Sequence, residues 1–266
     1  VICFAIGTIW FMILMKNGLV ATLGLCVFPY IIPDIIKIIV AVIIAIFVKD
    51  SDVRCVSSDS FKVSMAGKAL RHPVTWINGF IVMGLFMALS CSTYLNPMLS
   101  ENYGMDTTLA TGYSIYNRYV ARVLLATVGG LLLDRLKTPK FLTIFAVGMI
   151  VALGALIAVP MDHSFMIFAF ILCVLFSTIM GTSRSGMYTP IPEAKMPMNI
   201  TGTAMGICSA IGYSSDLWLY TLCGNWLDKY GSAGYNYIWI LTIGAMILVI
   251  FCSFLLHIYE KKYVTE

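Results

Sequence analysis

The sequence predicts an all-α polytopic membrane protein, and three observations support this prediction. Of the 266 residues, 60% are hydrophobic and only 11% are charged, whereas a soluble domain carries about 25% charged residues. Apolar runs recur along the whole chain, and about 20 helical residues are needed to cross a hydrocarbon core of roughly 30 Å. Helices are the default because a backbone that faces lipid must satisfy its own hydrogen bonds.

Six apolar spans follow Pro73, each bounded by charged residues or by Gly and Pro. They are predicted at residues 74–97, 108–133, 141–160, 164–189, 200–226 and 236–257. Two further spans are expected within residues 1–48, where Lys16, Pro29 and Pro33 interrupt the apolar sequence. Because the chain begins with Val1 and lacks a signal-peptide pattern, we expect a fragment that starts inside the membrane.

One substantial polar stretch divides the chain into two parts. Residues 49–72 are rich in Ser, Lys and Arg and are expected to form a cytoplasmic linker. The predicted domains are therefore a remnant of an N-terminal bundle at 1–48, this linker, and a C-terminal six-helix bundle with a short cytoplasmic tail at 73–266.

The distribution of Lys and Arg predicts the orientation of the spans, because short cytoplasmic loops hold the excess of these residues. With the linker in the cytoplasm, only Lys229 lies outside. The basic residues on the cytoplasmic side are then Lys49, Arg54, Lys62, Lys68, Arg71, Arg135, Lys137, Lys140, Lys195, Lys261 and Lys262. We therefore expect a multi-pass protein of the cytoplasmic membrane whose C-terminus is cytoplasmic.

Several classes of protein are disfavoured. The net charge is +4, but the basic residues form no aromatic-laced face, so no nucleic-acid partner is expected. The cysteines show no C-x-x-C spacing and no nearby His, so neither a metal site nor a cofactor is predicted. An enzyme is not expected, because His72, His163 and His257 all lie at span edges and no hydrolase motif occurs.

A short motif occurs twice. Gly130-Leu131-Leu132-Leu133-Asp134-Arg135 and Gly224-Asn225-Trp226-Leu227-Asp228-Lys229 both fit G-x-x-L-D-[RK] and end spans that are three apart. An odd separation places the copies on opposite sides of the membrane, as an inverted 3+3 repeat would. Gly130, Asp134 and Arg135 are candidates for a conformational motif, in which glycine permits close helix approach and the charges contact a neighbouring helix end. A chance match and an ordinary interfacial pair are the alternatives.

The segment from Gly129 to Lys140 resembles the cytoplasmic G-x-x-x-D-R loop of the major facilitator superfamily, in its second copy. The region from Pro192 through Gly202–Ile207 to Asp216 is similar to the tenth and eleventh helices of that superfamily's organic-anion and sugar-derivative carriers. The resemblance implies that the chain supplies helices five to twelve. It further implies alternating access, a substrate near the membrane midplane, and an N-terminal bundle of the same protein as the missing partner.

Charged residues inside the spans are the candidate binding residues, because each costs about 2.5–3.5 kcal/mol to insert. Arg118 and Arg122 lie four residues apart, hence on one helical face, and guanidinium groups suit carboxylate, phosphate or sulfonate. Asp216 is expected to accept a coupling proton or to neutralise an arginine. Arg184 is a second anion contact or a gate. Asn117 and Tyr213 complete the predicted substrate-binding set, while a purely structural pairing of Asp216 with an arginine is the alternative.

These residues predict a secondary transporter of a small organic anion, such as a sugar acid, sugar phosphate, sulfonate or carboxylate. Proton coupling or exchange would drive it. Its partners would be the substrate, H⁺ and the lipid bilayer. The alternative function is a non-transporting receptor or assembly subunit of the same fold.

Overall fold

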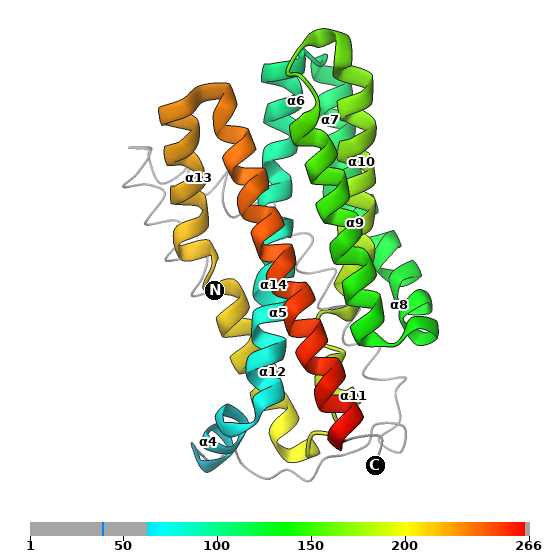
Figure 1. Ribbon diagram of the computed structural model, residues 1–266, viewed down its shortest axis with the longest axis vertical. Coiled ribbons are helices and arrows are strands. Elements are labelled where there is room, and N and C mark those ends of the chain that lie inside the picture. Colours follow the sequence, from blue (N-terminus) through cyan, green and yellow to red (C-terminus); the bar gives the residue numbers. More distant parts are fainter. Residues whose placement is uncertain (1–38, 40–62, 264–266) are drawn as a thin grey trace. The chain divides into compact units, whose positions relative to one another are not determined.

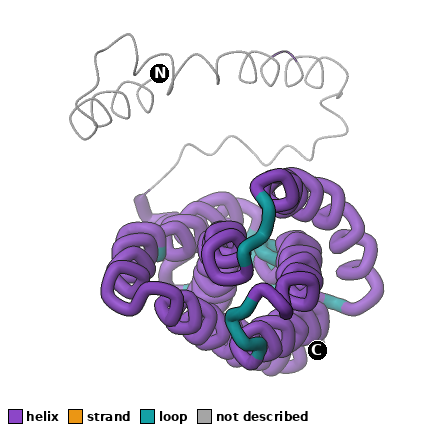
Figure 2. Tube along the Cα trace, turned by 90° about the horizontal axis from the view of Figure 1, so that it is seen from above, coloured by secondary structure: helices purple, strands orange, loops and turns teal. Residues whose placement is uncertain are grey.

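The computed structural model describes Ile39 and residues 63–263. The chain divides between residues 59 and 60 into two units, and every described residue except Ile39 belongs to the second. The two spans predicted within residues 1–48, and residues 49–62 of the predicted linker, lie outside the described residues. All the elements of the described unit are helices, which lie side by side when seen end-on (Figure 2).

The helices form six long segments after one short helix, α4 (Val63–Arg71). The segments, in chain order, are α5 (Pro73–Cys91), η1 (Ser92–Tyr94) and α6 (Leu95–Tyr103); α7 (Thr107–Ile115), η2 (Tyr116–Leu124) and α8 (Leu125–Leu136); α9 (Thr138–Ala158); η3 (His163–Phe165), α10 (Met166–Ser183), η4 (Arg184–Gly186) and α11 (Pro190–Glu193); α12 (Met198–Tyr213) and α13 (Asp216–Tyr230); and, after η5 (Gly231–Ala233), α14 (Gly234–Tyr263). Three of these elements interrupt the regular α-helices: η1 and η4 are 3₁₀-helices, and η2 is a π-helix.

Each of the six predicted spans is helical in the structure, with ends that differ by a few residues. Four stretches of the described chain are long and apolar enough to cross a membrane. They are Pro73–Tyr103, Thr138–Ala158, His163–Glu193 and Asn199–Tyr263, and the last reverses direction at η5 and covers two predicted spans (Figure 1). The segment 107–136 is not among them, and its central π-helix carries Arg118 and Arg122.

The segment ends follow from ordinary capping chemistry. Pro73 occupies the start of α5, where its missing N–H costs nothing. Gly104 ends α6 with φ of 64°, a left-handed conformation that glycine adopts without strain. The Asp106 carboxylate caps α7 by accepting a hydrogen bond of 2.9 Å from the Thr108 N–H. Lys137 alone separates α8 from α9, with φ of 61°.

The core lies where α14 packs against α5 and α9, α12 packs against α5 and α4, and α10 packs against α9 and α8. In Figure 1, α14 runs between α13 on one side and α9 on the other. The largest fully buried side chains come from several of these helices and are Trp239, Tyr103, Tyr235, Phe141 and Phe176. The described part of the predicted linker is thus helix α4, which is packed on the bundle.

Basic side chains gather at one end of the described bundle. The elements at this end are α4, the turn between α8 and α9, α11 and the end of α14 (Figure 1). Their basic residues are Lys68, Arg71, Arg135, Lys137, Lys140, Lys261 and Lys262. The opposite end carries Glu101, Asp106, Asp162 and Asp228 beside Lys229. This charge asymmetry agrees with the predicted alternation of loops, and the cytoplasmic location of the basic end stays a prediction from the positive-inside rule.

The two copies of the repeated motif end α8 and α13, at opposite ends of the bundle (Figure 1). Among the described residues, an added Cβ at Gly130 or Gly224 would meet nothing within 4 Å. Neither glycine therefore makes a close helix contact in that part of the chain, and the inverted repeat predicted from these motifs is not shown by the structure.

Two other glycines bring α10 into close contact with the segment formed by α7, η2 and α8. An added Cβ at Gly181 would collide with the backbone carbonyl of Ala121, and one at Gly129 would collide with the carbonyl of Thr182. Two hydrogen bonds hold the same pair of segments together: Tyr113 Oη to Ser177 Oγ at 2.8 Å and Tyr116 Oη to Thr178 Oγ1 at 2.5 Å. Small residues and buried hydroxyl bonds are how helices associate in a membrane.

We predict that Gly181→Ala destabilises the full-length protein, because the new methyl group has no room beside the Ala121 carbonyl and overpacking costs about 1–3 kcal/mol. Gly224→Ala is the matched control, since alanine there meets nothing within 4 Å and is favoured in a helix by up to about 1 kcal/mol. Thermal unfolding in detergent should show a lower midpoint for the first variant only. Equal midpoints would contradict the close contact.

Candidate functional site

Polar and charged side chains collect where four helical segments are interrupted. The interruptions are η1, η2, η4 and the non-helical pair Ser214 and Ser215 between α12 and α13. We use the name polar face for a set of six residues: Arg118, Arg122, Arg184, Tyr213, Asp216 and Tyr220. All of these are exposed on the described unit except Arg122, which is partly buried. Irregular backbone at membrane depth is tolerated where it is buried in protein or lines a water-filled cavity.

Three arginines converge on this face from two segments. The positive charges of Arg184 and Arg118 both act on Arg122. Arg118 and Arg122 come from η2, whereas Arg184 begins η4. The close contact of Gly181 with Ala121 places these two elements together, since Gly181 lies three residues before Arg184 and Ala121 directly before Arg122.

The cluster is not neutralised within the described chain. No salt bridge among the described residues reaches the three arginines, and the Nε of Arg122 is buried without a hydrogen-bond partner. The three guanidinium groups therefore present a concentrated positive charge, which favours an anion.

Asp216 is the first residue of α13, and a serine rather than an arginine binds its carboxylate. Its carboxylate accepts a hydrogen bond of 3.1 Å from Ser90 Oγ. In the described residues it forms no salt bridge with Arg118 or Arg122, so the structural pairing considered from the sequence is not observed. Tyr213, three residues earlier, is exposed and packs edge-on against Phe86 with ring centroids 4.5 Å apart.

Asn117 differs from the other predicted binding residues because it is buried. Its Nδ2 donates to the Ser92 carbonyl and to Ser92 Oγ, both at 3.3 Å. The amide therefore joins η2 to η1, while its buried Oδ1 has no partner in the described chain. A structural role accounts for the observed contacts, and the binding role stays a prediction.

The other predicted residues, Asp134 and Arg135 of the conformational motif, are exposed at the end of α8. Their side chains make no hydrogen bond or salt bridge with another described residue. The neighbouring Gly129, and not Gly130, lies close to another described helix, at Thr182 of α10. The motif's conformational role is not tested by these contacts.

Two residues of the site, Ser90 and Tyr220, were missed from the sequence. Ser90 binds Asp216, and Tyr220 faces Tyr94, a tyrosine that the sequence marks as a candidate for lining a polar cavity, with ring centroids 6.4 Å apart. Tyr220 lies four residues after Asp216, so a search for polar neighbours one helical turn away would have found it. Ser90 gave no such signal, because only tertiary packing brings it to α13. No group of three His, Cys, Asp or Glu side chains that could hold a metal occurs among the described residues.

Comparison with known proteins places the chain in a membrane. The inner membrane protein YqcE of Escherichia coli K12 is 30% identical over 219 residues, which are 79% of this chain and 51% of that protein. The inner membrane protein YihN of the same organism is 32% identical over 171 residues, 63% of this chain and 40% of that protein. An uncharacterized MG294 homolog of Mycoplasma pneumoniae is 23% identical over 213 residues, 73% of this chain and 45% of that protein.

The chain therefore spans about half the length of the curated relatives it matches. It is a multi-pass protein of the inner membrane, as the sequence predicted. No solved structure matches it.

The family comparison corrects the resemblance given above. The model that matches is that of the BioY family, over residues 1–52. The assignment to the major facilitator superfamily is contradicted by this match and is wrong. The numbering of the spans as helices five to twelve, and the inverted repeat expected from that superfamily, therefore lose their support. The short loop motif on which the resemblance rested is only a few residues long, and such a motif recurs by chance in apolar sequences.

We predict that the polar face contacts water in the membrane-embedded protein, because its charged groups are too costly to expose to lipid. In a cysteine-free full-length background, Ser214→Cys should react with a membrane-impermeant thiol reagent, since Ser214 is exposed between Tyr213 and Asp216. The matched control is Ile171→Cys, an exposed apolar position on α10, which should stay unlabelled in liposomes. Equal labelling of both positions would contradict a water-lined face.

Proposed function

We propose that the chain is part of a transport protein that carries a small anionic solute across the inner membrane, and that the polar face forms part of the solute site. This proposal rests mainly on the cluster of Arg118, Arg122 and Arg184. No carboxylate among the described residues neutralises their charge. The match of residues 1–52 to BioY, a family of transport proteins rather than enzymes, supports the transport role.

The cost of charge burial supports an anionic solute. Each charged side chain at membrane depth costs about 2.5–3.5 kcal/mol on insertion scales, so three cations on one face need compensation. Water in a cavity supplies part of it. A bound carboxylate, phosphate or sulfonate supplies more, because guanidinium groups bind these anions through paired, charge-assisted hydrogen bonds.

The backbone geometry supports a cavity at the same place. The π-helix η2 carries two of the arginines, and π-helical turns occur frequently at functional sites. The break at Ser214 and Ser215 exposes Tyr213 and Asp216 beside it. Both irregularities fall near the middle of their helical segments, which is where a solute site within a membrane is expected.

Asp216 has a separate role in this proposal. Its carboxylate is exposed, accepts only the Ser90 hydroxyl among the described groups, and is not paired with an arginine. As the one acidic side chain of the polar face, it is the group that we assign to coupling transport to H⁺. Exchange of one anion for another is the alternative, and in that case Asp216 contacts a hydroxyl group of the solute.

The match to BioY favours one more specific form of the proposal, namely a substrate-specific component of an uptake transporter that works with partner subunits. Such a component binds solute without carrying it alone. A non-transporting receptor would behave in the same way. Binding together with flux in proteoliposomes that contain only this protein would instead indicate a self-sufficient carrier.

The test is a binding screen on the purified full-length protein, by thermal stabilisation and calorimetry. The probes are gluconate, glucose 6-phosphate, isethionate and biotin, with glucose as the neutral control; biotin is included because of the BioY match. We expect at least one anion, and not glucose, to stabilise the protein.

Arg122→Gln should weaken binding of that anion by about ten- to hundredfold, because a hydrogen bond to a charged group contributes roughly 1.5–3 kcal/mol. Arg122→Lys should retain part of the affinity, since it keeps the charge and loses the paired geometry. The control Lys229→Gln removes one charge at the far end of the bundle and should bind normally. Unchanged binding by Arg122→Gln would refute the anion site.

A further inference from the structure

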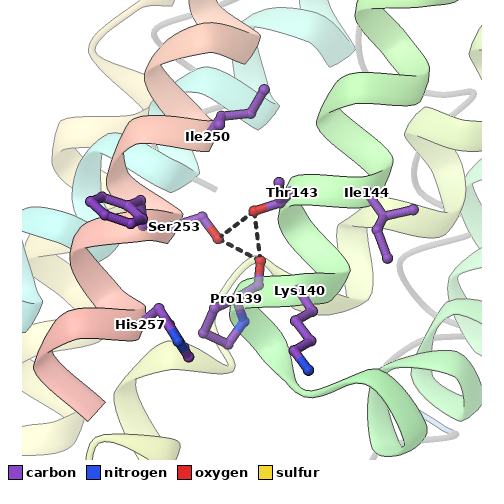
Figure 3. A pocket seen from close by; sticks show the side chains of 8 residues that line it. Pro139, Lys140, Thr143, Ile144, Ile250, Ser253 and His257 are labelled. Atoms are coloured by element: carbon purple, nitrogen blue, oxygen red, sulfur yellow. Dashed lines mark hydrogen bonds between the residues drawn. The ribbon is translucent and has the colours of Figure 1, made fainter. Parts of the chain in front are cut away.

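A groove that shares no residue with the polar face lies between α9 and α14. The groove has a volume of about 340 Å³ and is lined mostly by apolar side chains, Ile144, Ile250 and Phe254 among them. Figure 3 shows Ile250 toward one end of the groove, and Lys140 and His257 toward the other. The groove is therefore apolar along its length and carries a cation, with a second nitrogenous side chain, at one end.

The polar groups in the wall of the groove are already satisfied. Ser253 Oγ donates to the Pro139 carbonyl at 2.6 Å, and Thr143 Oγ1 lies 2.8 Å from the same carbonyl and 3.2 Å from Ser253 Oγ (Figure 3). These bonds satisfy the hydrogen-bonding capacity of the Pro139 carbonyl in the first turn of α9. A ligand in the groove thus meets apolar surface along the wall and polar chemistry only at Lys140 and His257.

The depth of the groove in the membrane follows from the length of α9. Its 21 residues span about 31 Å, close to the thickness of the hydrocarbon core. Lys140 is its third residue and so lies at the membrane interface, at the basic end of the bundle. Lys261 follows His257 by one helical turn and lies on the same face of α14. The first turn of α9 adds the partial positive charge of a helix N-terminus.

The flanking surface faces outward and is apolar. Ile144 is 54% exposed and Phe254 60% exposed, and Val147, Ile247 and Phe251 continue this surface toward the middle of the helices. In a membrane such a surface contacts acyl chains, and basic pockets between helices at the cytoplasmic side bind anionic lipid headgroups. We propose that this groove binds an anionic phospholipid, with one acyl chain between α9 and α14 and the headgroup phosphate at Lys140, His257 and Lys261.

The site is independent of the solute site, because it shares no residue with the polar face. The experiment is lipid binding by native mass spectrometry of the full-length protein in detergent, with dioleoyl phosphatidylglycerol and dioleoyl phosphatidylcholine as probes. We expect tighter binding of phosphatidylglycerol. Lys140→Gln should weaken its binding about fivefold, the effect of one cation near an anionic lipid, and adding His257→Gln should weaken it further.

Two more variants separate the contributions of charge and groove. Ile144→Trp leaves every cation in place but fills the groove from an exposed position, so it should also reduce phosphatidylglycerol binding. Lys229→Gln removes one cation at the other end of the bundle and should have no effect. Equal binding of the two lipids, or equal effects of Lys140→Gln and Lys229→Gln, would overturn the proposal. Full binding by Ile144→Trp together with competition by soluble glycerol 1-phosphate would likewise overturn it, by showing an anion site that takes no acyl chain.

Discussion

The close approach of α10 to the segment formed by α7, η2 and α8 is the contact on which the polar face depends. Gly181 and Gly129 leave no room for a side chain against the carbonyls of Ala121 and Thr182. In lipid, association of helices gains little from the hydrophobic effect, so van der Waals packing at small residues and buried hydroxyl bonds must hold them together. Tyr113 and Tyr116 supply those bonds. The result is that Arg122 and Arg184, from different segments, lie beside each other.

That arrangement opposes electrostatic stability, and the proposed binding of an anion would offset part of this cost. Three like charges at membrane depth repel one another and resist insertion, and nothing in the described chain neutralises them. Proteins keep such unfavourable groups where binding requires them. The interruption of the helices at the same place is consistent with this, because regular helices would direct fewer polar backbone and side-chain groups to one face.

The polar face and the groove between α9 and α14 differ in where they carry charge. The polar face gathers charge near the middle of the helices, where only a cavity or another part of the protein can cover it. The groove between α9 and α14 keeps charge at one end and apolar surface along its length, which matches the structure of a lipid. The basic and acidic ends give the bundle a fixed polarity, and the lipid groove opens at the basic end. The BioY match covers residues 1–52, and the residues that form the two surfaces all come later in the sequence.

Composition and hydropathy by themselves determined that the chain is an all-α, multi-pass membrane protein, where the long helical segments of residues 73–263 lie to within a few residues, and which charged residues are exceptional. These features are local: hydrocarbon thickness sets the length of each span, and the cost of charge burial marks Arg118, Arg122, Arg184 and Asp216 wherever they pack. The short loop motif did not determine the family, because a few residues at a helix end carry too little information. Only the tertiary structure decided that Asn117 binds η1, that Asp216 binds Ser90 instead of an arginine, and that Gly129 and Gly181 make the close contacts. Those outcomes depend on which helices are neighbours, and residues far apart in the sequence, such as Ser90 and Asp216, become partners only through packing.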